Sequence, residues 1–340
     1  MILTMLIGVA FHGNAMSFAL DSIAEWGKFP RFCVKTYRWG DKFFNSYDST
    51  FVKGTGYKMN VKTRINNWFD NDRFLLDGDT WVEMRSPATN TIGFDITYLA
   101  VSLGYDFNIN KIFGGTPHRK SKFNFDFNCA LFSASLYAIR NNSGMNLKRV
   151  GDLRHINEHF DGVNSSSWGI DAVYFFNNKR YSHAAGFAMS KLQLRSQGSF
   201  FVGFSYDGHD LAFDFSKMPD NLKPQLPEDW QNSKIEIKEN TYGIKGGYGY
   251  NWVPCKHLTI GVSESIFPAL SFSKQDIEDN FGTRIRFYNR LYASIVWNKN
   301  RWFGGAVAKT NVALVTDGNS VLATSLFSFE FKLGWRFNIW

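Results

Sequence analysis

The chain has 340 residues, and 17% of them are Phe, Tyr or Trp, a share that is high for a soluble enzyme and expected for a membrane barrel with aromatic girdles. Its formal net charge is +8, but the basic residues are scattered and no nucleic-acid-binding motif accompanies them, so nucleic acid is not an expected partner. No apolar run reaches the roughly 18 residues that a spanning helix needs, which excludes a helical membrane protein.

The amino-terminal part of the chain divides into two segments. Residues 1–20 are mostly apolar, with small residues toward their end, and they predict a signal peptide even though no Lys or Arg precedes the apolar stretch. Residues 21–56 do not alternate: their aromatic residues fall near helical spacing, and Pro30 interrupts them. We interpret 21–56 as a short periplasmic helical segment with a linker, and a partly ordered linker is the alternative.

From residue 57 to residue 340 the sequence reads as one strand after another. Apolar and polar residues alternate, for example in 57–65 and 101–109, which places them on opposite faces of each strand. Short connections such as 177–180 alternate with long ones such as 218–237, as they do in membrane barrels. The pattern predicts an all-β fold, a closed antiparallel transmembrane β-barrel of about fourteen strands (about 12–16).

An even number of strands places both termini in the periplasm, and the expected location is integral to the outer membrane. A soluble β-sandwich or lipocalin-like barrel is the alternative fold, but it does not explain such long strands with so many outward aromatic residues.

The last strand alternates most strictly. Its odd positions are apolar and its even positions are mostly polar or charged, which fits lipid on one side and water on the other. We expect it to pair with the first strand, 57–68, because closure removes both edges of the sheet. It is the predicted insertion strand, with the apolar residues Phe327, Phe329, Phe331, Leu333, Trp335, Phe337 and Ile339 and the terminal Trp340.

This strand resembles the carboxy-terminal signal by which Gram-negative outer-membrane proteins are recognised for insertion. It departs from that signal because the residues in phase with Trp340 are Asn338, Arg336 and Gly334, which are not apolar.

Three stretches carry a closer resemblance to a known family. They are Tyr47-Asp48-Ser49-Thr50-Phe51 with Tyr57-Lys58-Met59-Asn60, then Asn177-Asn178-Lys179-Arg180-Tyr181-Ser182, then Arg195-Ser196-Gln197-Gly198-Ser199-Phe200 with Phe213-Asp214-Phe215-Ser216-Lys217. Together they resemble the Bacteroidota barrel family catalogued as domain of unknown function 4421, over most of the chain after residue 45 or so. The resemblance implies an outer-membrane barrel and supplies no activity and no site residues.

The inward face of the predicted barrel carries charges of both signs. If the first strand closes against the last, the basic residues gather on one wall and the acidic residues of the amino-terminal half gather opposite. The interpretation is a field across an aqueous pore; the alternative is a lumen packed with salt bridges or filled by a plug. The basic wall is Lys58, Lys62, Arg64, Arg284, Arg286, Arg290, Lys332 and Arg336, and the acidic wall is Asp95, Asp106, Asp126 and Asp171.

His155, Glu158 and His159 spell a zinc-binding pattern, H-x-x-E-H. On a helix the two histidines could hold zinc while the glutamate activates water. Here the motif falls in a predicted extracellular loop between strands, so a solvated polar loop is the preferred interpretation and no metal is expected. The cysteines Cys33, Cys129 and Cys255 are odd in number and far apart, which predicts isolated thiols.

No nucleophile elbow, phosphate loop or cofactor motif is present in the sequence. We therefore expect a non-enzymatic barrel without a cofactor, acting as a structural or accessory subunit of a larger outer-membrane assembly for protein insertion or export. A passive or ligand-selective small-solute channel is the alternative, and an outer-membrane hydrolase is a remote one. The expected partners are outer-membrane lipid, the outer-membrane insertion machinery, and other outer-membrane proteins or lipoproteins.

Overall fold

The computed structural model describes residues 46–76, 78–98, 101–110, 120–273, 283–317 and 320–338. The predicted signal peptide, 1–20, and most of the predicted helical segment, 21–45, lie outside the described residues, as do Cys33, Ile339 and Trp340. The described part of that segment, 46–56, forms a turn and a short strand, β1 (Val52–Gly54). Among the described residues, no helix has the length and apolar character that crossing a membrane requires.

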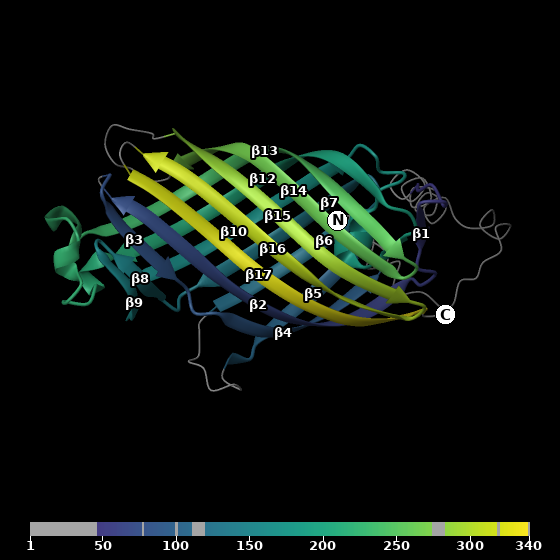
Figure 1. Ribbon diagram of the computed structural model, residues 1–340, viewed down its shortest axis with the longest axis horizontal. Helices are drawn as coiled ribbons and strands as arrows, with labels where there is room; N and C mark the ends of the chain where they lie inside the picture. Colours follow the sequence, from purple (N-terminus) through teal and green to yellow (C-terminus); the bar gives the residue numbers. More distant parts are fainter. Residues whose placement is uncertain are drawn as a thin grey trace, which may run out of the picture.

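In the described ranges, twelve antiparallel strands form the barrel wall (Figure 1). The ring closes because β17 pairs with β2 from Val321–Leu75 to Phe337–Met59, which are the last and first strands of the barrel, as expected. The strands are β2 (Met59–Leu76), β4 (Thr89–Tyr98), β5 (Val101–Asn108), β6 (Lys120–Asn128), β7 (Phe132–Asn141), β10 (Val163–Phe175), β12 (Gln197–Asp214), β13 (Lys234–Cys255), β14 (Leu258–Ser273), β15 (Thr283–Lys299), β16 (Trp302–Asp317) and β17 (Ser320–Phe337).

The outer face of the barrel is apolar and the inner face is polar. On β17, the side chains of Phe331 and Leu333 are 63% and 58% exposed, whereas Glu330 and Arg336 are 4% and 1% exposed. Trp252, Trp297 and Trp302 are also exposed and lie near strand ends. An outward apolar belt with inward charges is stable only when lipid surrounds the barrel. The predicted closed antiparallel transmembrane barrel is therefore confirmed, with twelve strands where about fourteen were expected.

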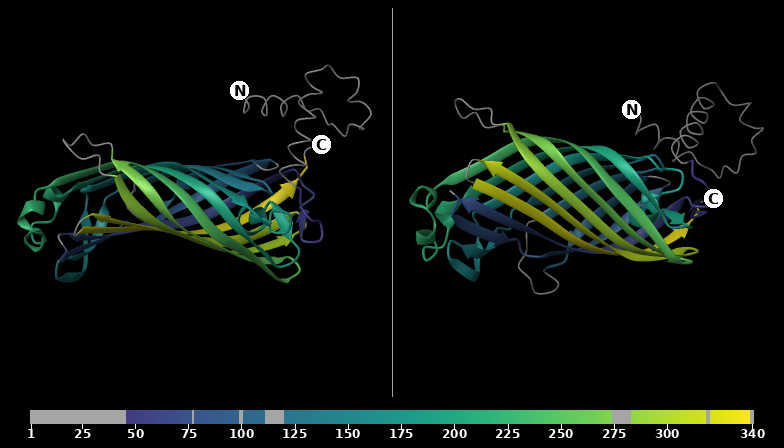
Figure 2. Two further views of the ribbon diagram at one scale, coloured as in Figure 1. Left: turned by 90° about the horizontal axis from the view of Figure 1, so that it is seen from above. Right: turned by 45° about the horizontal axis from the view of Figure 1, so that its top comes forward.

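At one end of the barrel, three short strands extend the wall and build an apolar core (Figures 1 and 2). β3 (Thr80–Arg85) continues the line of β4, while β8 (Met145–Val150) and β9 (Leu153–Phe160) extend the hairpin of β7 and β10. The connection between β12 and β13 folds onto them as three 3-10 turns, η4 (Phe215–Lys217), η5 (Lys223–Gln225) and η6 (Glu228–Trp230). We call this core the distal cluster; its buried residues are Phe74, Leu76, Val82, Met84, Met145, Leu147, Val150, Phe160, Val163, Phe213, Phe215, Met218, Leu222 and Leu226.

At the opposite end, where the described chain begins and ends, the connection between β10 and β12 turns into the barrel. This inturned segment, 176–196, contains a π-helical turn, η3 (Ala184–Ala188), and the short strand β11 (Lys191–Gln193), which pairs with β1. The turn expected at 177–180 is present, with the Arg180 N–H donating to the Asn177 backbone oxygen at 3.1 Å. Contrary to expectation, it is not the whole connection between two strands, because it is followed by Tyr181, Ala184, Ala185, Phe187 and Met189, all buried inside the barrel.

Candidate functional site: a luminal chamber between two filled ends

The inturned segment reaches across the bore of the barrel. Phe187 and Met189 pack against Val296, Phe303 and Val307 of β15 and β16. Tyr181, at the other side, packs against Phe175 and Phe201 of β10 and β12. Because β10 and β16 lie five strands apart in the ring of twelve, the segment spans the mouth and does not simply line one wall.

Arg336 fastens the inturned segment to the last strand. Its side chain, 1% exposed, donates hydrogen bonds to the backbone oxygen of Met189 at 2.7 Å, to the Asn298 side-chain oxygen and to the backbone oxygen of Asn300. The guanidinium group also lies 4.0 Å from the centre of the Phe303 ring. The predicted luminal residue Arg336 is therefore part of the mouth and not of an open wall.

Gln193 organises the rest of the segment. Its amide nitrogen donates to the backbone oxygens of Arg180 and Arg195 at 2.7 and 3.0 Å, and its amide oxygen accepts from the Ser182 N–H at 3.0 Å. Asn251 of β13 donates to the Ser182 backbone oxygen at 2.8 Å. Because buried amides hold these loop carbonyls and N–H groups, the segment can stay inside the barrel without unpaired backbone groups at these positions.

The stretches that carry the family resemblance meet at this mouth. The Asp48 N–H donates to the Lys179 backbone oxygen at 2.8 Å, and the Leu194 N–H donates to the Phe51 backbone oxygen at 2.7 Å. The Arg180 guanidinium lies 5.1 Å from the centre of the Phe51 ring. Within the first stretch, hydrogen bonds from the Thr50 hydroxyl and N–H lower the pKa of Asp48. These stretches lie far apart in the sequence, and the fold brings them together in one structure.

The remaining stretch of the resemblance, 213–217, closes onto the opposite end. Phe213 and Phe215 are buried in the distal cluster, and between them Asp214 lies 3.4 Å from the Lys234 ammonium and 4.0 Å from that of Lys217. Both ends of the lumen are therefore filled by segments that the family resemblance singles out.

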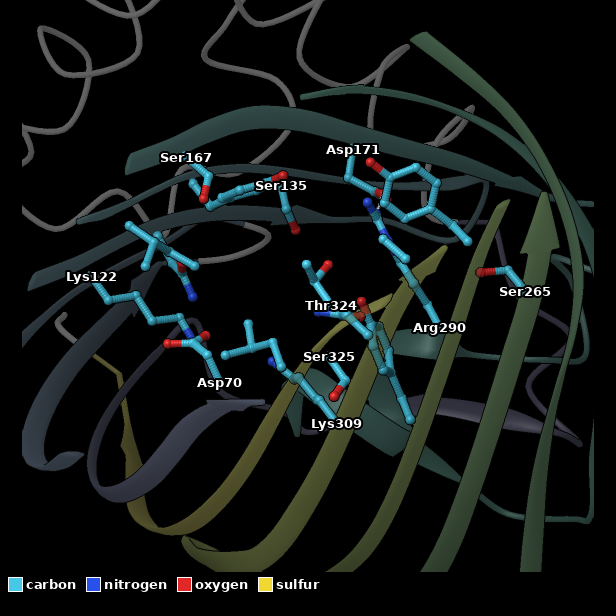
Figure 3. A pocket seen from close by; sticks show the side chains of 18 of the residues that line it. Asp70, Lys122, Ser135, Ser167, Asp171, Ser265, Arg290, Lys309, Thr324 and Ser325 are labelled. Atoms are coloured by element: carbon cyan, nitrogen blue, oxygen red, sulfur yellow. Dashed lines mark hydrogen bonds and ion pairs between the residues drawn. The ribbon is translucent and has the colours of Figure 1, made fainter. Parts of the chain in front are cut away.

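Between the two ends lies a polar chamber of about 400 Å³ (Figure 3). His183, Phe187 and Ala188 of the inturned segment border it on one side, and Met145 and Val163 of the distal cluster border it on the other. Figure 3 shows charged and hydroxyl side chains directed into this space from several strands. The chamber is a concave polar site in the described part of the chain, and its lining is the candidate functional surface.

The charges in the chamber are paired, and neither wall carries charges of one sign only. Arg64 of β2 contacts Asp95 of β4 at 2.6 Å and Asp106 of β5 at 2.8 Å. The predicted basic residues lie on or beside β15, β17 and β2, and the predicted acidic residues lie on β4, β5, β6 and β10, so the two sets occupy different arcs of the ring and meet at the β2–β4 boundary. Neither arc has a single sign of charge, however, because Glu330 lies on β17 and Lys122 lies on β6.

A second group of ion pairs crosses the lumen. Asp171 of β10 pairs with Lys245 of β13 and with Arg290 of β15, and Arg290 also lies 3.4 Å from Asp207 of β12. Glu239 of β13 pairs with Arg286 and, at 3.8 Å, with Arg284. These contacts tie the predicted basic residues of β15 to carboxylates on β13, β12 and β10, which lie two, three and four strands away around the ring; Figure 3 labels Arg290 and Asp171 of this group.

The third group surrounds Glu330 of β17. This carboxylate, 4% exposed, lies 2.6 Å from the Lys332 ammonium and 3.5 Å from that of Lys309. Lys62 is buried beside this group, Lys58 is exposed before β2, and Asp126 accepts a hydrogen bond from Ser135 at 2.6 Å. Charged residues that belong to the chamber or its ion pairs but were absent from the predicted walls are Asp70, Asp72, Lys122, Asp207, Asp210, Glu239, Lys245, Lys309 and Glu330. Their alternation with apolar neighbours is the signal that could have found them.

The H-x-x-E-H motif lies in β9 and not in a helix or a loop. Residues four apart on a strand are separated by roughly 13 Å, so His155 and His159 cannot share one zinc ion. His159 contacts Asn146 and Asp161, and Glu158 accepts from Asn221. Among the described residues there is no group of three His, Cys, Asp or Glu side chains that could hold a metal.

Zinc analysis of the purified protein tests this directly. We expect no zinc to remain after metal-free purification, and His155→Ala to change the free energy of unfolding by less than about 0.5 kcal/mol because the side chain is exposed. Stoichiometric zinc that the His155→Ala variant loses would contradict the strand geometry.

The fold and the chamber define a transmembrane β-barrel whose two ends are filled and whose lumen is held by ion pairs. Residues 46–337 match the family described as Domain of unknown function (DUF4421), and the chain belongs to this family.

Solved structures with similar chain traces are outer-membrane proteins. The translocator domain of the autotransporter NalP from Neisseria meningitidis is 11% identical, with 95% of this chain and 100% of that chain covered and a TM-score of 0.34. The outer membrane protease OmpT from Escherichia coli is 7% identical, with 82% and 96% covered and a TM-score of 0.33. The toluene transporter TodX of P. putida is 6% identical, with 87% and 96% covered and a TM-score of 0.23. No curated protein matches this chain.

Proposed function

We propose that this protein is a non-enzymatic barrel of the outer membrane that serves as a structural or accessory subunit of a larger assembly for protein insertion or export. The observation that carries the proposal is the inturned segment, which occupies the mouth and is bonded to β10, β12, β13, β15, β16 and β17. A constitutively open pore needs a continuous water path, and this mouth is filled with buried apolar and amide side chains. We infer that the mouth faces the periplasm.

A small-solute channel is the second candidate, and the polar chamber favours it. Such a channel would conduct only after the inturned segment moves, because His183, Phe187 and Ala188 border the chamber. Selectivity would then come from the ion-paired groups of Arg64, Arg290 and Glu330.

The two candidates differ in the native mass of the protein and in its conductance. For a tagged protein extracted from outer membranes in mild detergent, we expect stoichiometric partner proteins and no steady conductance in planar bilayers. A lone barrel with steady conductance that Arg290→Glu abolishes would refute the accessory role and support the channel. Arg301→Glu, an exposed residue at the β15–β16 turn, is the matched control for the charge change.

A further inference from the structure

β5 and β6 are neighbouring strands of the barrel wall that are hydrogen-bonded over only part of their length. They pair from Val101–Phe127 to Leu103–Phe125, and no pairing continues along the rest of their described residues. By contrast, β5 pairs with β4 along its whole length, from Tyr98–Val101 to Thr91–Asn108. We call the parts of the two strands that do not pair with each other, 104–107 of β5 and 121–124 of β6, the open seam.

The strands on either side explain why this seam is unpaired. β3 continues the line of β4, β8 continues the line of β7, and the two pair directly from Val82–Val150 to Arg85–Asn146. At the end of the barrel that holds the distal cluster, the wall is therefore completed by the β3–β8 pairing, and the β5–β6 hairpin is not part of it there. As a result, the open-seam parts of β5 and β6 stay bonded to β4 and β7 but not to each other.

The outer side of the open seam lies in the apolar belt. Tyr105, Phe107 and Phe123 flank it and are 63%, 54% and 46% exposed, and the rings of Tyr105 and Phe107 meet edge to face with centres 4.8 Å apart. In lipid, each unpaired backbone N–H or C=O group costs several kcal/mol. An unpaired seam at this depth is therefore stable only if a polar group enters it from the membrane or from the lumen.

The inner side of the open seam carries charges of both signs, and its carboxylates, Asp106 of β5 and Asp95 opposite Gly104, both pair with Arg64. Lys122 and Asn124 of β6 and Lys62 of β2 line the chamber. Arg64, Lys309 and Lys332 each have a carboxylate oxygen within 4.0 Å, but in the described ranges neither Lys62 nor Lys122 has one. The Lys62 side chain is buried and the Lys122 side chain is partly buried, and two ammonium groups without a carboxylate oxygen in reach favour an anion beside the seam.

We propose that the open seam binds an amphiphile with an anionic headgroup taken from the surrounding bilayer. The headgroup enters the chamber between β5 and β6 and accepts hydrogen bonds from the Lys62 and Lys122 ammonium groups. The hydrocarbon tail stays outside and packs along Tyr105, Phe107 and Phe123. This site does not depend on the proposed accessory role, since it uses a different wall of the barrel from the inturned segment.

Native mass spectrometry of the intact protein in a neutral detergent tests the proposal, with dilauroyl phosphatidic acid as the probe. We expect one tightly held molecule of this lipid, and weaker binding by roughly tenfold in Lys62→Gln and in Lys122→Gln, because each variant loses a charge-assisted hydrogen bond. Lys256→Gln, at the exposed β13–β14 turn, removes the same charge and is expected to bind like the wild type.

Two further measurements test which chemical class of ligand binds and where on the barrel it binds. Dilauroyl phosphatidylcholine and inorganic phosphate should each bind at least tenfold more weakly, and phosphatidic acid should slow amide exchange in 104–107 and 121–124 but not in 101–103. Equal retention of the neutral lipid would overturn the anionic site, and equal binding of free phosphate would overturn the amphiphile. Unchanged affinity in both lysine variants, or unchanged exchange at the seam, would place the lipid elsewhere and refute the proposal.

Discussion

Replacing Arg336 by methionine is expected to loosen the inturned segment and lower the free energy of unfolding by about 2–4 kcal/mol. Methionine fills similar volume, so the loss comes from the acceptors that Arg336 leaves behind, chiefly the Met189 and Asn298 oxygens. A buried acceptor without a donor costs about 1–3 kcal/mol. Removal of the buried charge offsets part of this, since Arg336 has no carboxylate partner in the described residues.

Urea unfolding of the barrel in detergent micelles measures the stability change, and planar bilayers measure the opening of the mouth. We expect current steps in Arg336→Met that the wild type lacks, because Met189 and the chain before it lose their tie to β17. Arg301→Met changes an exposed arginine at the same end of the barrel and serves as the control. If Arg336→Met unfolded at the same urea concentration as the wild type and gave no current steps, apolar packing of Phe187 and Met189 alone would keep the segment in place.

The barrel itself can be predicted from the sequence because surrounding lipid requires apolar and polar residues to alternate with a period of two along each strand. The outward positions of β17 show it: Phe329, Phe331 and Leu333 are exposed, and Ser328 and Glu330 between them are buried. The same alternation placed Arg286 and Arg290 on the inner face, where both are buried. Period alone, however, does not say how far neighbouring strands are shifted along each other.

That shift decides which charges meet. Lys62 faces Asp95 in the register of β2 and β4, yet the shortest contact of Asp95 is with Arg64, two positions further along β2. Asp171 reaches Arg290 from four strands away around the ring. Which side chains meet across the lumen depends on the diameter and shear of the barrel, and these are set by all twelve strands together. A division into two walls assumed that the charged residues of each half of the chain stay on their own side.

The exact number of strands, which lies at the low end of the expected range of about 12–16, and the course of the inturned segment do not follow from the sequence pattern for a related reason. Turn-forming residues such as Asn177 and Asn178 indicate where a strand ends but not where the chain goes next. Here Asn177 donates to the Gly198 backbone oxygen of β12 at 2.8 Å, so it holds the start of the inturned segment against the strand that follows this segment. In the same way, Pro87 lies between β3 and β4, which together form one bent strand beside β2.

Replacing Arg290 by methionine is expected to have the largest effect on stability, a loss of about 3–5 kcal/mol. Arg290 pairs with Asp171 and Asp207, and it lies over the rings of Phe267 and Tyr288 at 5.2 and 5.8 Å from their centres. Removing one partner of a buried ion pair leaves an uncompensated charge, which costs more than the pair itself contributes. Asp171 keeps Lys245, but Asp207 is left with the Ser205 and Tyr137 hydroxyls.

A double-mutant cycle separates this stranded charge from lost packing. If the cost comes from Asp207, then Asp207→Asn in the Arg290→Met background restores about half of the lost stability, measured by urea unfolding with tryptophan fluorescence. Arg290→Lys should lose less than Arg290→Met, because an ammonium group still reaches one carboxylate. If Asp207→Asn added its own destabilisation to that of Arg290→Met, packing against Phe267 and Tyr288 would be the role of Arg290. The Arg290 side chain would then stabilise the chamber by filling space beside these rings and not by compensating the carboxylate charges.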